Sequence, residues 1–155
     1  MRNFIICSLL IISSISFTYS QGYNTGVGVR VGFSNGLTVK HFINKKAAIE
    51  GVLSTRWKGF NITGLYEVHN NTGLYQLNWY YGAGAHIGFW NGKNVKWAND
   101  NNDYIVIGID GVIGLEYIFD NIPFNVSLDW KPTMNLIGHS EFWGDNGAIS
   151  LRYIF

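Results

Sequence analysis

Apolar and polar residues alternate with a period of two along almost the whole chain beyond its first twenty residues. Around Val27, Val29 and Val31, for example, every second position is glycine or arginine. Such alternation is typical of β-strands with one apolar and one polar face, whereas amphipathic helices repeat every three to four residues. The pattern predicts eight strands, at about 24–34, 36–43, 46–57, 59–69, 76–90, 104–119, 123–132 and 147–155.

Short connections separate most of these strands. Ser34-Asn35-Gly36, Asn44-Lys45 and Asp120-Asn121 contain residues that favour tight turns. Only two connections are long, at about 91–103 and 133–146. Consecutive strands joined by short turns pair antiparallel, and an even number of them closes when the last strand pairs with the first. We therefore expect an all-β fold, an eight-stranded antiparallel up-and-down β-barrel.

The charged residues indicate which face of the barrel points inward. The apolar face carries no acidic or basic residue in any predicted strand, and only His41 interrupts it. The polar face carries five positive and five negative residues: Arg30, Lys40, Glu50, Arg56, Glu67, Asp110, Glu116, Asp129, Lys131 and Arg152. A soluble barrel turns its apolar face inward, whereas a membrane barrel turns it to lipid, where a Lys or Arg costs about 2–4 kcal/mol. The clean separation therefore favours a transmembrane barrel with its charges inside.

Aromatic residues give a second test of the membrane interpretation. If both chain ends lie on the periplasmic side, fourteen aromatic residues of the apolar face fall near strand ends. The lower set is Tyr23, Tyr66, Trp79, Tyr81, Tyr117, Phe119, Phe124, Tyr153 and Phe155, and the upper set is Phe33, Trp57, Phe60, Phe89 and Trp130. Two aromatic girdles around an aliphatic band are typical of membrane barrels. The same orientation places both long connections on the extracellular side.

Composition excludes several other classes of protein. The 155 residues include 11 Lys+Arg and 10 Asp+Glu; 47% are hydrophobic and only 14% are charged. Disordered chains are rich in charge and poor in aromatic residues, so disorder is excluded. The single Cys rules out an internal disulfide framework, and the net charge of +1 argues against nucleic acid as a partner.

The first twenty residues have the features of a secretory signal peptide. Arg2 gives a positive start, residues 4–12 are almost wholly apolar, and Thr18-Tyr19-Ser20 places small residues where signal peptidase requires them. The apolar run is shorter than the roughly 20 residues of a membrane-spanning helix. We expect cleavage near Ser20/Gln21, which leaves residues 21–155 as the barrel domain.

The chain ends in Leu151-Arg152-Tyr153-Ile154-Phe155, after strands of about ten residues. In these features it resembles the small outer-membrane β-barrels of Gram-negative bacteria, the OmpX/OmpA-like group. The resemblance implies an outer-membrane location and a C-terminal signal, formed by Leu151, Tyr153 and Phe155, that the barrel-assembly machinery recognises. It also implies outer-membrane lipid and periplasmic chaperones as partners, and no cofactor. The first two hairpins depart from the family, because their surface loops are very short.

The interior of an eight-stranded barrel is only wide enough to be filled by side chains, so a wide pore is not expected. We predict a lumen charge network of nine residues: Arg30, Glu50, Arg56, Glu67, Asp110, Glu116, Asp129, Lys131 and Arg152. His86 and Asp110 form the pair closest to catalytic geometry, because a carboxylate can orient an imidazole base. No nucleophile can be assigned beside His86, and the four His residues lack metal-ligand spacing. We therefore predict no catalytic, cofactor-binding or metal site.

These observations predict an integral outer-membrane protein with a structural or surface-interaction role, and not an enzyme. The connection 133–146 is unusually apolar for an exposed loop, since it contains Met134, Leu136, Ile137, Phe142 and Trp143. It either packs over the barrel mouth, touches lipopolysaccharide or contacts a partner. Three alternative functions stay open: a soluble exported lipocalin-like carrier of an apolar ligand, an outer-membrane lipid-modifying enzyme, and a small channel.

Overall fold

The computed structural model of the chain describes residues 23–56, 58–95 and 102–155. The predicted signal peptide, its cleavage site and residues 96–101 of the first long connection lie outside the described residues. The strands are β1 (Thr25–Gly32), β2 (Asn35–Phe42), β3 (Ala47–Arg56), β4 (Gly59–Asn71), β5 (Leu77–Asn91), β6 (Asp103–Ile118), β7 (Phe124–Trp130), β8 (Thr133–Ile137), β9 (Phe142–Trp143) and β10 (Gly147–Ile154). A short 3-10 helix, η1 (Gly92–Asn94), follows β5. Among the described residues, no helix has the length and apolarity needed to cross a membrane.

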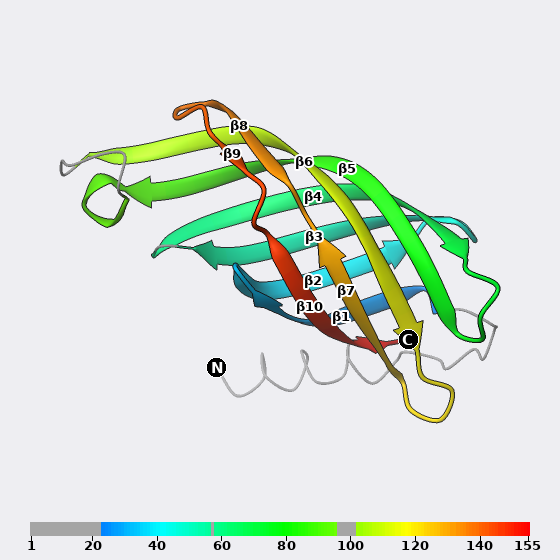
Figure 1. Ribbon diagram of the computed structural model, residues 1–155. Helices are drawn as coiled ribbons and strands as arrows, with labels where there is room; N and C mark the ends of the chain where they lie inside the picture. Colours follow the sequence, from blue (N-terminus) through cyan, green and yellow to red (C-terminus); the bar gives the residue numbers. More distant parts are fainter. Residues whose placement is uncertain (1–22, 57, 96–101) are drawn as a thin grey trace, which may run out of the picture.

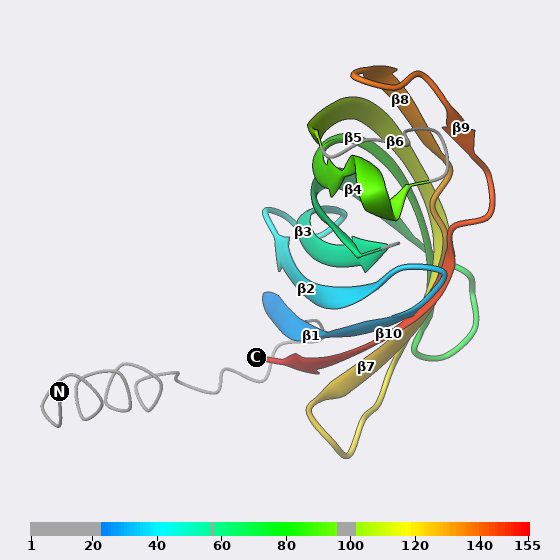
Figure 2. The same ribbon diagram turned by 90° about the vertical axis from the view of Figure 1, so that its left-hand side faces the viewer.

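Eight of these strands form a closed antiparallel barrel, which confirms the predicted fold, with strand bounds within two residues of the predicted ones. Each strand from β1 to β6 pairs with the next, and β10 closes the ring by pairing with both β7 and β1. Figures 1 and 2 show β10 lying between β7 and β1. We call the end where Thr25 N donates to Phe155 O, at 2.9 Å, the lower end.

The prediction of a loop at 133–146 is wrong, because β8 and β9 form there. β7 pairs with residues 113–118 of β6, and β8 continues upward along the same strand, pairing with residues 107–110. Pro132 separates the two segments, and proline cannot donate to the ladder of backbone hydrogen bonds. Alternation nevertheless continues beyond it, because Thr133 and Asn135 are buried while Met134 and Leu136 are exposed. β9 then folds back beside β8.

The barrel is apolar outside and polar inside. Valine, isoleucine and leucine side chains cover the outer wall, where Val29 and Ile109 are about half exposed. Inside, Lys40, Glu116 and Arg152 are fully buried. Within the strands that the structure describes, the only exposed Asp, Glu, Lys or Arg is Asp103, the first residue of β6. The separation of faces expected from the alternation is therefore present.

Glycine on the inner face makes room for a large buried side chain. A Cβ on Gly114 would lie only 2.7 Å from the ring of Tyr80 and 2.7 Å from Asp129 Cβ. Tyr80 is itself fully buried. A side chain at Gly114 would therefore push the Tyr80 ring out of the position that it occupies at the centre of the lumen.

The barrel wall is taller on one side than on the other. β5 and β6 contain 15 and 16 residues, whereas β1 and β2 contain 8 each. At about 3.3 Å per residue, β6 is about 50 Å long and β1 about 26 Å. Figure 1 shows β5 and β6 extending past β1 to β3 at the upper end, where the β8–β9 hairpin lies beside β6.

Candidate functional site: the charged lumen

Five charged side chains from five strands fill the lower half of the lumen. Lys40 Nζ lies 2.8 Å from Glu67 Oε2, 3.4 Å from Glu50 Oε2 and 3.6 Å from Glu116 Oε2. Arg152 Nη2 donates to Glu50 Oε1 at 2.5 Å, and its Nη1 lies 3.8 Å from Glu116 Oε2. We call these five residues the lower cluster. Its side chains contact one another across the barrel. It combines three carboxylates with two cations, so it has one carboxylate more than it has cations.

A second ion pair lies next to the lower cluster. Arg30 Nη1 donates to Asp129 Oδ2 at 2.7 Å, and a shorter contact joins Arg30 Nη2 to Asp129 Oδ1. The Tyr80 hydroxyl also donates to Asp129 Oδ2, at 3.0 Å. The Tyr80 ring centroid lies 4.0 Å from Lys40 Nζ, within the range of a cation–π contact. Tyr80 therefore connects this pair to the lower cluster.

The upper half of the lumen is organised around Asp110. Its Oδ1 accepts hydrogen bonds from Lys131 Nζ and from Thr133 Oγ1, both at 2.7 Å. Its Oδ2 lies 2.8 Å from His86 Nδ1, and His86 Nε2 lies 3.0 Å from Asn135 Oδ1. We call these five residues the upper cluster. Because both carboxylate oxygens of Asp110 have partners, the buried charge is stabilised.

The upper mouth is covered by an arginine and two tryptophans. Arg56 Nη2 donates to Asp145 Oδ2 at 2.8 Å, and Arg56 Nη1 donates to Asn146 Oδ1 at 2.6 Å. The charged hydrogen bond from Arg56 lowers the pKa of the Asp145 carboxyl below its usual value, because it favours the ionised form. The Arg56 guanidinium lies 5.0 Å from the Trp143 ring centroid, and Trp143 contacts Trp90 edge-on at 5.7 Å.

Tyr23 occupies the lower end of the lumen, so its predicted outward position is wrong. Its hydroxyl donates to Glu116 Oε2 at 2.9 Å, and its ring meets Phe42 edge-on at 5.1 Å. Tyr23 precedes β1, and its side chain is therefore not held to the alternation of that strand. Among the other predicted girdle residues, Trp57 lies outside the described residues.

Aromatic rings do gather on the outer wall at the lower end. Trp79 stacks with Tyr81 at 5.4 Å, and Tyr117 meets Phe119 edge-on at 5.1 Å. Phe124 likewise meets Tyr153 edge-on, at 5.5 Å. These three pairs come from β5, β6, β7 and β10 and the short turn after β6, and together they form an aromatic rim on that side of the barrel.

The nine residues of the predicted lumen network all point into the barrel or its mouth, but in separate groups. Eight of them are buried, and Arg56 is half-buried at the upper mouth. Glu50, Glu67, Glu116 and Arg152 belong to the lower cluster; Arg30 pairs with Asp129, and Lys131 with Asp110. Lys40 stands at the centre of the lower cluster although the nine do not include it. Lys40 lies on the polar face of its predicted strand, and this position could have added it to the predicted network.

Sequence analysis missed two tryptophans of the upper lumen, Trp90 and Trp143. Trp90 is buried, and its place on the same strand face as Tyr80 and His86 was an available signal. Trp143 belongs to the segment that was predicted to be a loop. Its position in the sequence therefore did not predict whether its side chain points into the lumen or outward. Its indole Nε1 donates to Glu141 Oε2 at 2.7 Å. The mouth cover therefore depends on the β8–β9 hairpin, which sequence analysis missed.

His86 and Asp110 lie together as their strands predict, but their partners do not form a nucleophile–base pair. The nearby Thr133 hydroxyl donates to Asp110 and not to His86. Thr63, which sequence analysis did not connect with His86, lies opposite it on β4 and is buried. Both ring nitrogens of His86 already contact Asp110 and Asn135, so neither accepts a proton from Thr63. Among the described residues, no group of three His, Cys, Asp or Glu is placed to hold a metal ion.

The predicted C-terminal signal lies on the closing strand. Leu151 and Tyr153 are exposed on the outer wall, and Phe155 is half-buried. The Phe155 carbonyl accepts hydrogen bonds from Asn24 N at 3.2 Å and from Thr25 N at 2.9 Å. Recognition of these residues by an assembly machinery stays a prediction.

Comparisons with protein-family models, with curated proteins and with solved structures find no match to this chain. The geometry described above is therefore the basis for assigning a function.

Proposed function

We propose that this protein is an integral β-barrel of a bacterial outer membrane, exported with a signal peptide that is cleaved near Ser20/Gln21. Its role is structural or concerns interactions at the cell surface. The observation that carries the proposal is the apolar outer wall of the barrel. The charged side chains of its strands point into the lumen. We further propose that it belongs with the small OmpX/OmpA-like barrels.

The composition of the outer wall supports a lipid environment. A water-facing barrel gains nothing by removing every Lys and Glu from its strand surface, whereas in hydrocarbon each such residue is costly. Closure of the ring supports the same environment, because an open sheet edge would leave backbone groups unpaired in lipid. The aromatic rim that includes Trp79, Tyr117 and Tyr153 suits the boundary between hydrocarbon and headgroups.

The contents of the lumen support a structural role. The lower cluster, the Arg30–Asp129 pair and the upper cluster lie one after another along the axis, with Trp90 and Trp143 at the upper mouth. Buried ion pairs that interlock in this way resist displacement, because separating them leaves an uncompensated charge. A carrier of apolar ligands would need an apolar lumen, and an esterase-like enzyme would need a hydroxyl bound to His86.

The β8–β9 hairpin supports a part in surface interactions. Met134, Leu136, Ile137 and Phe142 are all about half exposed or more on this hairpin. Their side chains continue the apolar wall above β7, along the upper part of β6. In the proposed orientation the hairpin rises on the extracellular side, where it can contact lipopolysaccharide or a partner. The assembly machinery, periplasmic chaperones and outer-membrane lipid are the other proposed partners.

Gel mobility tests the proposal directly. Residues 21–155 are refolded into phosphatidylcholine vesicles and run in SDS with and without boiling, before and after protease treatment. A closed membrane barrel keeps its fold in SDS until heated, so the unboiled sample should run at a different position and resist the protease. A chain that folds in plain buffer, fails to insert into vesicles and runs at one position would contradict the proposal.

A further inference from the structure

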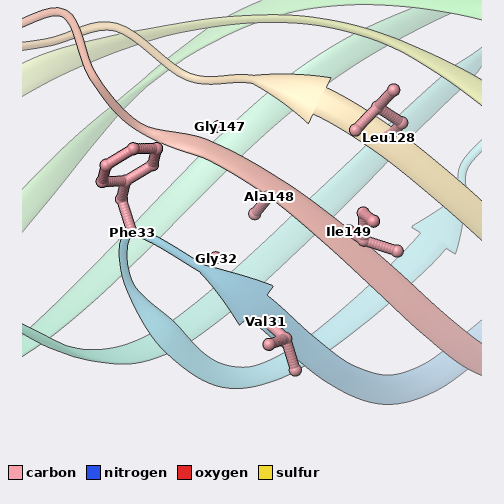
Figure 3. A pocket seen from close by; sticks show the side chains of 7 residues that line it. All are labelled: Val31, Gly32, Phe33, Leu128, Gly147, Ala148 and Ile149. Carbon is pink, nitrogen blue, oxygen red and sulfur yellow. The ribbon is translucent and has the colours of Figure 1, made fainter.

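Two adjoining apolar grooves lie on the outer wall near the point where β7 and β10 part from each other. The first has a volume of about 370 Å³; it is lined by Val31, Gly32, Phe33, Leu128, Gly147, Ala148 and Ile149. Figure 3 shows Val31, Phe33, Leu128 and Ile149 around the backbone of β1 and β10. The second has a volume of about 480 Å³, and its lining includes Trp79, Leu115, Leu128, Asp129, Trp130 and Gly147. Leu128 and Gly147 line both grooves, so the two are continuous.

The grooves present little but hydrocarbon to an occupant. Asp129 contributes to the second groove, but its carboxylate points into the lumen and is bonded to Arg30 and Tyr80. Trp130 also lines this groove, and its indole Nε1 already donates to Gly144 O at 2.7 Å. The remaining side chains of both grooves are aliphatic or aromatic. An occupant must therefore be apolar over the length that lies in the grooves.

We propose that the two grooves hold the two hydrocarbon chains of one diacyl phospholipid, a site that rests on the proposed membrane location. Both grooves are shallow and open along the wall, a shape that suits flexible hydrocarbon chains better than a compact molecule. A stable contact with a second copy of the chain would instead need a broad patch of about 800 Å² on each partner. Because the grooves are continuous with the aliphatic outer wall, lipid chains reach them without leaving the hydrocarbon.

The floor of the grooves explains why they lie on this side of the barrel. Gly147 begins β10 and has no side chain to fill the space between Leu128 and Phe33. A Cβ on Gly147 would meet Asp129 O at 4.0 Å and no described atom closer than that. Leucine at this position would therefore fit the backbone and place its side chain in the grooves.

The chain offers a matched control on the opposite side. Gly64 on β4 also faces outward, and a Cβ there would meet no described atom within 4 Å. The comparison is therefore between Gly147→Leu and Gly64→Leu, which add the same side chain to the same wall. A second pair removes the residue shared by the grooves: Leu128→Ala on β7, with Leu53→Ala on β3 as its control.

Native mass spectrometry of the barrel, released from nanodiscs of palmitoyl-oleoyl phosphatidylethanolamine, measures lipid that stays bound. We expect the wild-type barrel to retain one phospholipid as the collision energy rises. Gly147→Leu fills the grooves and Leu128→Ala removes part of their lining. Each should therefore retain phospholipid about tenfold less well, a loss of contacts worth roughly two methylene groups. Gly64→Leu and Leu53→Ala should behave like wild type.

The outcomes separate this inference from the proposed function. If all variants shift on gels after heating but retain phospholipid equally, the groove site is wrong and the membrane location stands. A dimer peak that Gly147→Leu removes, without bound lipid, would also overturn the site and assign the grooves to a second copy. A wild-type chain that neither inserts nor shifts on heating would overturn both proposals.

Discussion

The two faces of the barrel wall differ in chemistry although the same strands form both: the outer face is apolar and exposed, and the inner face is charged and buried. On β10, Leu151 and Arg152 are neighbours in sequence, yet Leu151 is 46% exposed on the outside and Arg152 is fully buried in the lumen. Outside, the wall is almost wholly apolar, and its aliphatic side chains are about half exposed. Inside, nearly every charged atom has a particular partner, such as the carboxylate of Glu50 for the guanidinium of Arg152.

This difference shows which positions tolerate substitution and which require one particular side chain. An outer position can exchange one aliphatic side chain for another at little cost, because only apolarity is required there. A lumen position depends on charge, length and direction together, because a buried charge that loses its partner costs more free energy than the pair contributes. The outer wall and the lumen should therefore respond differently to the same class of substitution.

The largest effect should come from removing a cation from the lower cluster. Arg152→Met keeps much of the volume but leaves Glu50 and Glu116 without the guanidinium, and we expect a loss of about 3–5 kcal/mol. The free energy of unfolding in urea, measured in vesicles, gives the loss. Leu151→Met, one residue away on the outer wall, should cost less than about 1.5 kcal/mol. Equal losses for the two variants would remove the distinction between the faces.

A charge on the outer wall should cost somewhat less, and only if that wall meets lipid. Ile109→Lys places an ammonium midway along β6, and we expect a loss of about 2–4 kcal/mol at the centre of a bilayer. Ile137→Lys, at the upper end of β8, should cost less than about 1 kcal/mol, because it lies near the interface or above it. Urea titration of both variants in vesicles measures the difference. A tolerated Lys at both positions would argue that the outer wall faces water.

A smaller effect should distinguish two carboxylates within the lumen. Glu50 is contacted by Lys40, Arg152 and Thr38, whereas Glu67 contacts Lys40 and His69 and keeps Oε1 without a hydrogen-bond partner. Because the lower cluster has one carboxylate more than it has cations, Glu67→Gln should cost less than about 1 kcal/mol. Glu50→Gln should cost about 1.5–3 kcal/mol, as expected for hydrogen bonds to charged groups. The reverse order of unfolding free energies would show that the excess charge lies at Glu50.

The smallest effect on the free energy of unfolding should come from protonation of Asp145 at the exposed rim of the lumen. Its pKa is lowered in the folded barrel by Arg56, so the pair stabilises the fold above the ordinary pKa of Asp, near 3.9. This contribution is lost as the pH falls through the lower pKa of the folded state. Since Asp145 is half exposed, we expect less than about 1 kcal/mol. Unfolding in urea at pH 6 and at pH 3, with Asp145→Asn as the control, measures it; an equal acid response in both proteins would refute the assignment.

The strands were predictable because each has a distinct apolar and polar face. The closed ring followed from their number and their short turns. The β8–β9 hairpin was not predicted because Pro132 interrupts the hydrogen-bond ladder and resembles the start of a loop. The alternation of Thr133, Met134 and Asn135 could have shown that the strand continues.

The sequence predicted which side chains point into the lumen, but not which of them contact one another. Inward positions follow from alternation, whereas the pairing of Arg30 with Asp129 depends on the register across β1, β10 and β7. Tyr23 escaped prediction for another reason. It lies before the first strand, so alternation does not place its side chain, and its contacts with Glu116 and Phe42 exist only in the closed ring.

The pairing of β1 with β10 also sets the order of events during folding. Gly26 pairs with Ile154, so the ring cannot close until segments from opposite ends of the chain have met. Contacts between residues so far apart in sequence are slow to form, and both strands expose unpaired backbone edges in the meantime. Until the ring closes, these unpaired edges can pair with the edges of other chains. Joining residue 155 to residue 23 and opening the chain in the turn between β6 and β7 would make this closure a local hairpin and move the slow step to the new ends.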